Sequence, residues 1–91
     1  MDKREIVRPA RAGSAESNDV LVIISPSDDL TIDISSEVSV QYGEDIEKVI
    51  REKLQDLGVE KAQIKIEDKG ALDFTLRARV EAAVLRGAKN V

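Results

Sequence analysis

The sequence predicts a single α+β domain of two layers, in which a small sheet is covered on one face by two helices. Three observations predict this class: short apolar runs that fit strands, longer apolar stripes at helical spacing, and a length of 91 residues that suits one domain. A chain of this length buries roughly 60–65% of its unfolded surface and can fold without disulfides or metals. The expected order is β-β-α-β-α, with a mixed or antiparallel sheet made of a hairpin and a third strand.

The first 19 residues hold no sustained apolar period. Residue types typical of turns and loops occur there instead, namely Pro9, Gly13, Ser14, Ser17 and Asn18. Such residues offer little apolar surface to offset a backbone ordering entropy of roughly 1–2 kcal/mol each. We therefore expect a flexible N-terminal arm over residues 1–19, extended or mobile and anchored by Ile6 and Val7, and a single compact α+β domain over residues 20–91.

The first two strands are predicted from the apolar pattern that follows this arm. Residues 20–24 form a continuous aliphatic run, and residues 30–34 alternate between apolar and polar side chains. The segment between them is rich in turn formers, so we expect the two strands to pair as an antiparallel hairpin. Asp28 and Asp29 in this segment are expected to be turn residues and not metal ligands.

A central helix is predicted from a longer apolar stripe. The stripe contains Val38, Tyr42, Ile46, Val49, Ile50, Leu54 and Leu57. Its start lies between residues 36 and 44, with Ser36 as a candidate N-cap and Gly43 as a candidate later start. Gly58 follows the stripe at the position that favours a left-handed residue, which predicts a Schellman ending with Val59 packed on Leu54.

The last third of the chain predicts a strand and a second helix. Residues 62–67 alternate, with Ile64 and Ile66 facing inward, and Asp68-Lys69-Gly70 then turns the chain. Residues 72–89 continue a helical stripe that carries Leu72, Leu76, Val80, Ala83 and Val84. The alternative is a fourth strand over residues 71–76, because a short apolar alternation fits both structures.

Composition narrows the classes of function. The chain has no histidine and no cysteine, so the common Ser–His and Cys–His nucleophile pairs cannot be built. No acid–base pair is singled out by spacing, and we expect neither a catalytic residue nor a metal site. A net charge of −4 opposes binding to nucleic acid or to an anionic membrane. No apolar run fits a signal peptide or a membrane span, and we expect a cytoplasmic protein whose partners are proteins or small molecules.

Ser17 is the residue that best fits a role in covalent chemistry. It lies in the segment AGSAESNDV, residues 12–20, just before the first apolar run. Because the chain has no histidine to activate a serine, Ser17 is better suited to be the point at which another protein attaches a reactive group. The alternative is a solvated turn serine in a small interaction adaptor without a cofactor, and the residue pattern fits both.

Three segments together form a combination that is specific enough to indicate a family: AGSAESNDV near the start, and DKGALD and LRARVEAA near the end. With this combination the chain resembles the acyl carrier proteins of citrate lyase, the gamma subunits, over residues 5–86. The resemblance implies a non-catalytic phosphoprotein of citrate fermentation, with 2′-(5″-phosphoribosyl)-3′-dephospho-coenzyme A joined by a phosphodiester to the serine of a Gly-x-x-Glu-Ser-x-Asp motif. In this chain the motif is residues 13–19 and the serine is Ser17, with Ser14 as the rival attachment point.

The resemblance also implies partners for this carrier. They are the alpha subunit, an acyl transferase, the beta subunit, a lyase, and the transferase that attaches the prosthetic group. The attached thiol is implied to carry acetyl and citryl thioesters between partner active sites. The carrier of malonate decarboxylase is the related alternative. The turn Asp68-Lys69-Gly70-Ala71 is a candidate phosphate contact through free backbone N–H groups and one cation, or else an ordinary turn.

Overall fold

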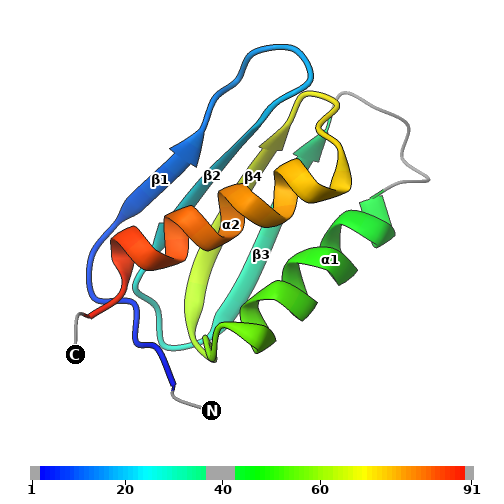
Figure 1. The fold of residues 1–91 in the computed structure, drawn as a ribbon. Helices are drawn as coiled ribbons and strands as arrows, with labels where there is room; N and C mark the ends of the chain where they lie inside the picture. The colour runs from blue at the N-terminus through cyan, green and yellow to red at the C-terminus, as the bar shows by residue number, and fades with distance from the viewer. Residues whose placement is uncertain (1–2, 37–42, 90–91) are drawn as a thin grey trace.

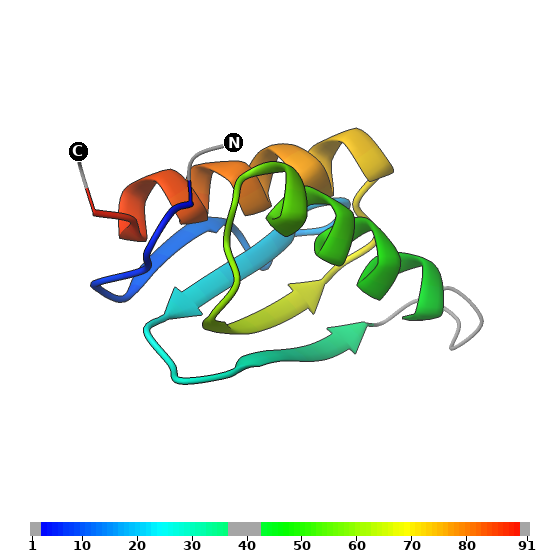
Figure 2. The ribbon, with the colours of Figure 1, turned by 90° about the horizontal axis from the view of Figure 1, so that it is seen from below.

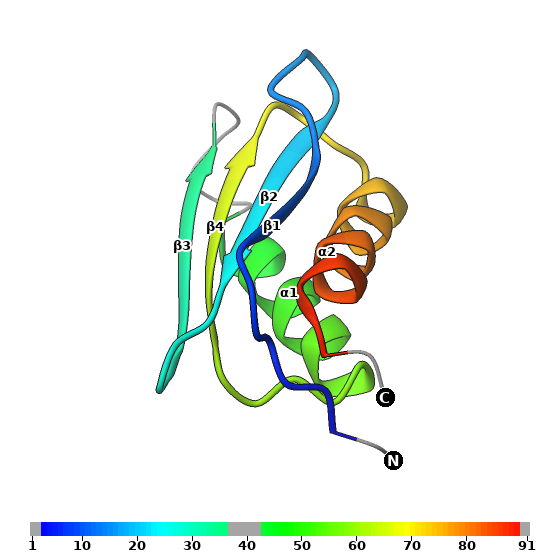
Figure 3. The ribbon, with the colours of Figure 1, turned by 90° about the vertical axis from the view of Figure 1, so that its left-hand side faces the viewer.

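The computed structural model describes residues 3–36 and 43–89. These residues form a four-stranded mixed sheet and two helices (Figure 1). The elements in chain order are β1 (Ala10–Gly13), β2 (Val20–Ser25), β3 (Leu30–Ser36), α1 (Gly43–Asp56), β4 (Ala62–Asp68) and α2 (Asp73–Gly87). Both helices lie on the same face of the sheet, as Figures 2 and 3 show. The predicted two-layer α+β class is therefore confirmed.

The pairing of the strands differs from the predicted hairpin. The strand order across the sheet is β1-β2-β4-β3, in which β2 is antiparallel to β1 and β4, and β3 is parallel to β4. The predicted pairing of residues 20–24 with residues 30–34 is wrong, because β4 lies between them. The reason is that β3, α1 and β4 form a parallel crossover unit, which brings β4 back beside β3 and leaves its other edge for β2.

Strand β1 is an element that the sequence analysis did not predict. Its residues pair with β2 from Ala10 opposite Ile24 to Gly13 opposite Leu21. Ile6 and Ala12 are buried, so the folded unit begins before the expected boundary at residue 19. This strand has only four residues, and their small or charged side chains form no apolar alternation by which the sequence could predict it. Its backbone pairing with β2 defines it as a strand. The mobility expected for residues 1–19 stays a prediction.

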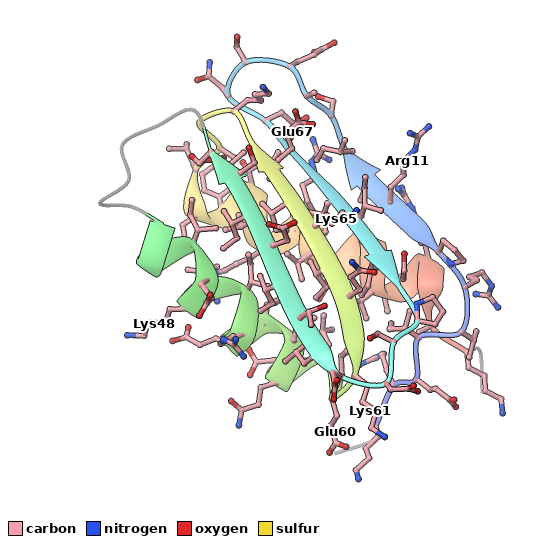
Figure 4. All side chains as sticks on the ribbon, turned by 180° about the vertical axis from the view of Figure 1, so that it is seen from behind. Arg11, Lys48, Glu60, Lys61, Lys65 and Glu67 are labelled. Carbon is pink, nitrogen blue, oxygen red and sulfur yellow. The ribbon has the colours of Figure 1, made fainter. Side chains whose placement is uncertain are left out.

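The core lies between the sheet and the helices. Its largest fully buried side chains come from β2, α1, β4 and α2, and they are Val20, Val22, Ile24, Ile50, Leu54, Ile64, Val80 and Val84. The alternation predicted for residues 62–67 is confirmed, because Ile64 and Ile66 are buried. The opposite face of the sheet is open and carries Lys65 and Glu67 (Figure 4).

Helix α1 begins at Gly43, within the predicted range for its start. The predicted N-cap at Ser36 is wrong, because Ser36 is the last residue of β3. Val38 and Tyr42 of the predicted stripe lie outside the described residues. The end of the helix is confirmed: Gly58 has φ +76°, and the N–H of Val59 donates to the carbonyl of Leu54 at 2.9 Å, which is the Schellman bond.

Helix α2 covers residues that had two interpretations. The helical interpretation is confirmed and the strand over residues 71–76 is wrong, since α2 runs from Asp73 to Gly87. The predicted inward residues Leu76, Val80, Ala83 and Val84 are buried, whereas Leu72 precedes the helix and is 63% exposed. No helix in the described part of the chain is long and apolar enough to cross a membrane.

Candidate attachment site

Ser17 lies in the loop of residues 14–19, which joins β1 to β2. The loop sits at one end of the sheet, next to the connection between β4 and α2 (Figure 1). Glu16, Ser17 and Asn18 at its tip are exposed. No hydrogen bond of the Ser17 side chain occurs among the described residues. Ser17 is exposed, so its hydroxyl is open to solvent and is not engaged by any residue that the structure describes.

The conformation of the loop's neck, which is where the chain leaves β1 at Gly13 and enters β2 at Val20, depends on Gly13. Gly13 has φ +86°, and a Cβ atom there would overlap the carbonyl oxygen of Val20 on the facing strand. The N–H of Ser14 donates to that same carbonyl at 3.2 Å. The chain can leave β1 and turn toward Ser17 in this way only because residue 13 has no side chain.

Asp19 closes the other side of the loop. Its carboxylate accepts two hydrogen bonds from the guanidinium of Arg79 in α2, Nε to Oδ1 at 3.1 Å and Nη2 to Oδ2 at 3.2 Å. It also accepts the Ser14 hydroxyl at 2.8 Å and the N–H of Val20 at 2.7 Å. The Arg79 hydrogen bonds first, and then those of Val20 and Ser14, lower the pKa of Asp19 from 3.8 to about 2. We call Ser14, Asp19 and Arg79 the neck cluster.

The β4–α2 turn holds the loop from a second side. The N–H of Asn18 donates to the carbonyl of Lys69 at 2.8 Å, and the N–H of Lys69 donates to the carbonyl of Asp19 at 2.9 Å. Asn18 adopts φ +67°, a left-handed conformation that asparagine tolerates. The loop is thus bonded to the neighbouring turn at the residues that directly follow Ser17.

The same turn does not offer a phosphate cradle. The N–H groups of Gly70 and Ala71 donate to Oδ1 of the buried Asp68 at 3.2 Å and 3.0 Å. Since the N–H of Lys69 is also bonded, the free N–H groups on which the predicted phosphate contact depended are absent from this turn as described. The contact is therefore wrong in that form, and Asp68 instead stabilises an ordinary turn.

The two candidate serines have different surroundings. The Ser14 hydroxyl is half-buried, donates to Asp19 and accepts from the N–H of Glu16 at 3.3 Å. The Ser17 hydroxyl is exposed at the loop tip. The sequence indicated both serines but did not reveal Arg79, because this residue lies 60 positions from Asp19 and only the fold brings them together.

The nearby Asp19 carboxylate is unsuited to act as a base for Ser17. Asp19, two residues away, has its carboxylate oxygens engaged by four hydrogen bonds and a pKa of about 2, so it is a poor proton acceptor near neutral pH. An open surface depression lined among others by Arg4, Pro26 and Lys61 lies beyond the other end of β2, away from this loop. An exposed serine in a chain without histidine or cysteine, beside an aspartate that is a poor base, fits the class of proteins that receive a group from another enzyme.

Comparisons with known proteins give the family within this class. The family model described as ACP, malonate decarboxylase delta subunit, matches residues 7–87. The citrate lyase acyl carrier protein of Escherichia fergusonii is 51% identical over 88 residues, which cover 94% of this chain and 91% of the relative. That of Haemophilus influenzae strain PittGG is 51% identical over 87 residues, covering 96% and 92%. The chain therefore belongs to the family of citrate lyase acyl carrier proteins, which are non-catalytic subunits.

Solved structures agree on the fold. A chain in the crystal structure of a Pseudomonas malonate decarboxylase hetero-tetramer in complex with malonate superposes with a TM-score of 0.78 and 20% identity, covering 92% of this chain and 87% of that one. A Thermus thermophilus structure gives a TM-score of 0.71 at 12% identity, covering 93% of this chain and 17% of that one. At these identities the likeness extends to the fold alone.

Proposed function

We propose that the chain is the acyl carrier subunit of a citrate lyase and that Ser17 bears 2′-(5″-phosphoribosyl)-3′-dephospho-coenzyme A through a phosphodiester. When attached, the group supplies a thiol that carries acetyl and citryl groups as thioesters between the active sites of partner subunits. The observation that carries the proposal is the exposed Ser17 hydroxyl on a loop whose neck is fixed by hydrogen bonds. The residues around Ser17 fit such a group, because the loop tip is open to solvent.

Burial and hydrogen bonding favour Ser17 over Ser14 as the attachment point. A transferase must reach the hydroxyl oxygen and remove its proton, and both requirements suit an exposed, unbonded side chain. Modification of Ser14 would remove its 2.8 Å hydrogen bond to Asp19 and disturb the neck cluster. Modification of Ser17 leaves these bonds in place.

The chain itself supplies a tether and no chemistry. Attachment places the thiol at a high effective concentration near any active site that binds the carrier, so the carrier needs no activating base. The proposed partners are the alpha subunit, which transfers the acyl group, the beta subunit, which cleaves the citryl group, and the prosthetic-group transferase. A cytoplasmic location stays a prediction.

The 51% identity to citrate lyase carriers favours citrate lyase over malonate decarboxylase as the parent complex. Reconstitution tests this choice. The chain, modified by its transferase and then acetylated on the attached thiol, should restore oxaloacetate formation from citrate when it is added to citrate lyase alpha and beta subunits, because citrate replaces the acetyl group on the thiol and acetate leaves. Ser17→Ala should give no activity, and Ser14→Ala should remain active. Activity of Ser17→Ala would overturn the site, and activity only with malonate decarboxylase subunits would overturn the parent complex.

A further inference from the structure

We propose that Arg79 is a positioning residue, which holds the neck of the 14–19 loop through Asp19 and so presents Ser17 to the enzyme that modifies it. This inference rests on the proposed function of Ser17. Arg79 lies in α2, on the layer that covers the sheet, whereas Ser17 lies in a loop of the sheet itself. The contact between Arg79 and Asp19 therefore fixes the loop relative to the second layer.

The geometry of the Arg79–Asp19 pair suits a positioning role. Both carboxylate oxygens are bonded, at 3.1 Å and 3.2 Å, so the guanidinium fixes the plane of the carboxylate as well as its position. The Asp19 side chain is only 19% exposed, and that of Arg79 is 41% exposed. A pair with two bonds and limited solvent access holds one geometry better than an exposed ion pair does.

Asp19 transmits this constraint to both sides of the loop. Its side chain accepts the Ser14 hydroxyl at the start of the loop, and its N–H donates to the carbonyl of Glu16 at 3.1 Å. Ser17 follows Glu16 directly. When Arg79 is absent, Asp19 keeps its bonds to Ser14 and Val20 but loses the two that tie its carboxylate to α2, so the backbone on either side of Ser17 is held less firmly.

Gly13 makes room for the aliphatic stem of Arg79. A Cβ atom on Gly13 would lie 3.2 Å from Cδ of Arg79, closer than side-chain carbons normally pack. Gly13 and Asp19 thus both contribute to the place that Arg79 occupies. Arg79 acts as a supporting residue: it does not react itself, but it fixes the loop that carries the reactive Ser17.

Arg77 provides a matched control on the same helix. It also forms a bonded ion pair, with Asp73 at 3.1 Å and with Glu52 at 3.3 Å. Asp73 belongs to α2 and Glu52 to α1, and neither lies in the 14–19 loop. Arg77→Ala therefore removes a similar surface interaction from α2 without touching the neck cluster.

The reaction to be measured is attachment of the prosthetic group. The Ser17 oxygen forms a new bond to phosphorus, the phosphoanhydride bond of an activated donor breaks, and its leaving group takes the electron pair. The Ser17 proton passes to a base of the transferase. The rate depends on how well the Ser17 oxygen is aligned, and a displacement of about 1 Å can cost up to a hundredfold.

The test uses the unmodified chain, the transferase and the phosphoanhydride donor, with the modified fraction followed by intact mass. Arg79→Ala should lower kcat/KM for attachment about ten- to a hundredfold, mainly through kcat. Arg77→Ala should stay within about twofold of the wild type. Asp19→Asn should resemble Arg79→Ala, and the double variant should be no slower than the slower single variant, because both remove one interaction.

A second measurement does not depend on activity. Backbone NMR order parameters of residues 15–18 should fall in Arg79→Ala and stay unchanged in Arg77→Ala. Urea midpoints verify that each variant folds, and Arg79→Lys, which keeps the charge but loses the two-pronged bond, replaces the alanine variant if that one unfolds. Wild-type attachment rates and order parameters in both Arg79 variants would overturn the inference. Modification that persists in Ser17→Ala would instead overturn the proposed function, and the NMR result would still decide the role of Arg79.

Discussion

Gly13 lies so close to the backbone of Val20, at the end of the β1–β2 pair, that a Cβ atom at position 13 would overlap the Val20 carbonyl oxygen. Gly13 also has φ +86°, which disfavours any other residue. Gly13→Ala should therefore lower the free energy of unfolding by at least about 1 kcal/mol. Urea denaturation measures this loss. Ser17→Ala, an exposed change in the loop that follows β1, is the control and should stay within about 0.5 kcal/mol; equal losses in both variants would contradict the close approach.

Leu54 tests the packing of α1 against the sheet. Its side chain is fully buried, so Leu54→Ala should cost about 2–4 kcal/mol through lost burial and the cavity left behind. Leu85→Ala is the matched control in α2, because Leu85 is 50% exposed and should cost far less. A urea midpoint for Leu54→Ala equal to that of Leu85→Ala would show that α1 does not pack as described.

Gly58 tests the Schellman ending of α1. The residue has φ +76°, and an alanine there must adopt a strained left-handed conformation. Gly58→Ala should lower the free energy of unfolding by about 1 kcal/mol, and Gly58→Asn should lower it less because asparagine tolerates this conformation. Thermal unfolding followed by circular dichroism gives the order of the three proteins, and an alanine variant as stable as the wild type would refute the ending.

Asp19 should make stability depend on pH in the acid range. Its pKa is about 2 in the folded chain, below the ordinary 3.8, so the unfolded chain binds more protons between these values. The stabilisation is then complete above about pH 4 and is lost as the pH falls toward about 2. The difference in Tm between the wild type and Asp19→Asn should shrink over this interval. A difference that stays constant from pH 6 to pH 2 would contradict the low pKa of Asp19.

The elements with local signals were predictable from the sequence. The apolar stripe around Ile50 and Leu54 and the glycine at position 58 define the body and end of α1, because period and capping act within a few residues. The alternation around Ile64 and Ile66 defines β4 for the same reason. These interactions depend on side-chain direction along one element and need no knowledge of the rest of the fold.

The strand pairing and the neck cluster were not predictable in this way. The partner of β2 depends on where α1 returns the chain, so an antiparallel hairpin with β3 and the observed pairing with β4 give the same local pattern. The contact between Arg79 and Asp19 joins residues 60 positions apart and leaves no spacing signal. The local sequence is enough to predict that Ser17 is a loop serine. The residues that fix this loop, Asp19 and Arg79, are brought together only by the fold.

Locating the added mass on the modified chain decides whether Ser17 carries the prosthetic group. The chain is produced together with its transferase and the enzymes that make the donor, and is then digested with a protease that cleaves after glutamate. Glu16 lies between the two candidate serines, so digestion separates a peptide that ends at Glu16 and contains Ser14 from a peptide that begins at Ser17. We predict that the added mass lies on the peptide that begins at Ser17 and that fragmentation places it on its first residue. Added mass on the peptide that contains Ser14 would instead show that the group is attached to Ser14 and not to Ser17.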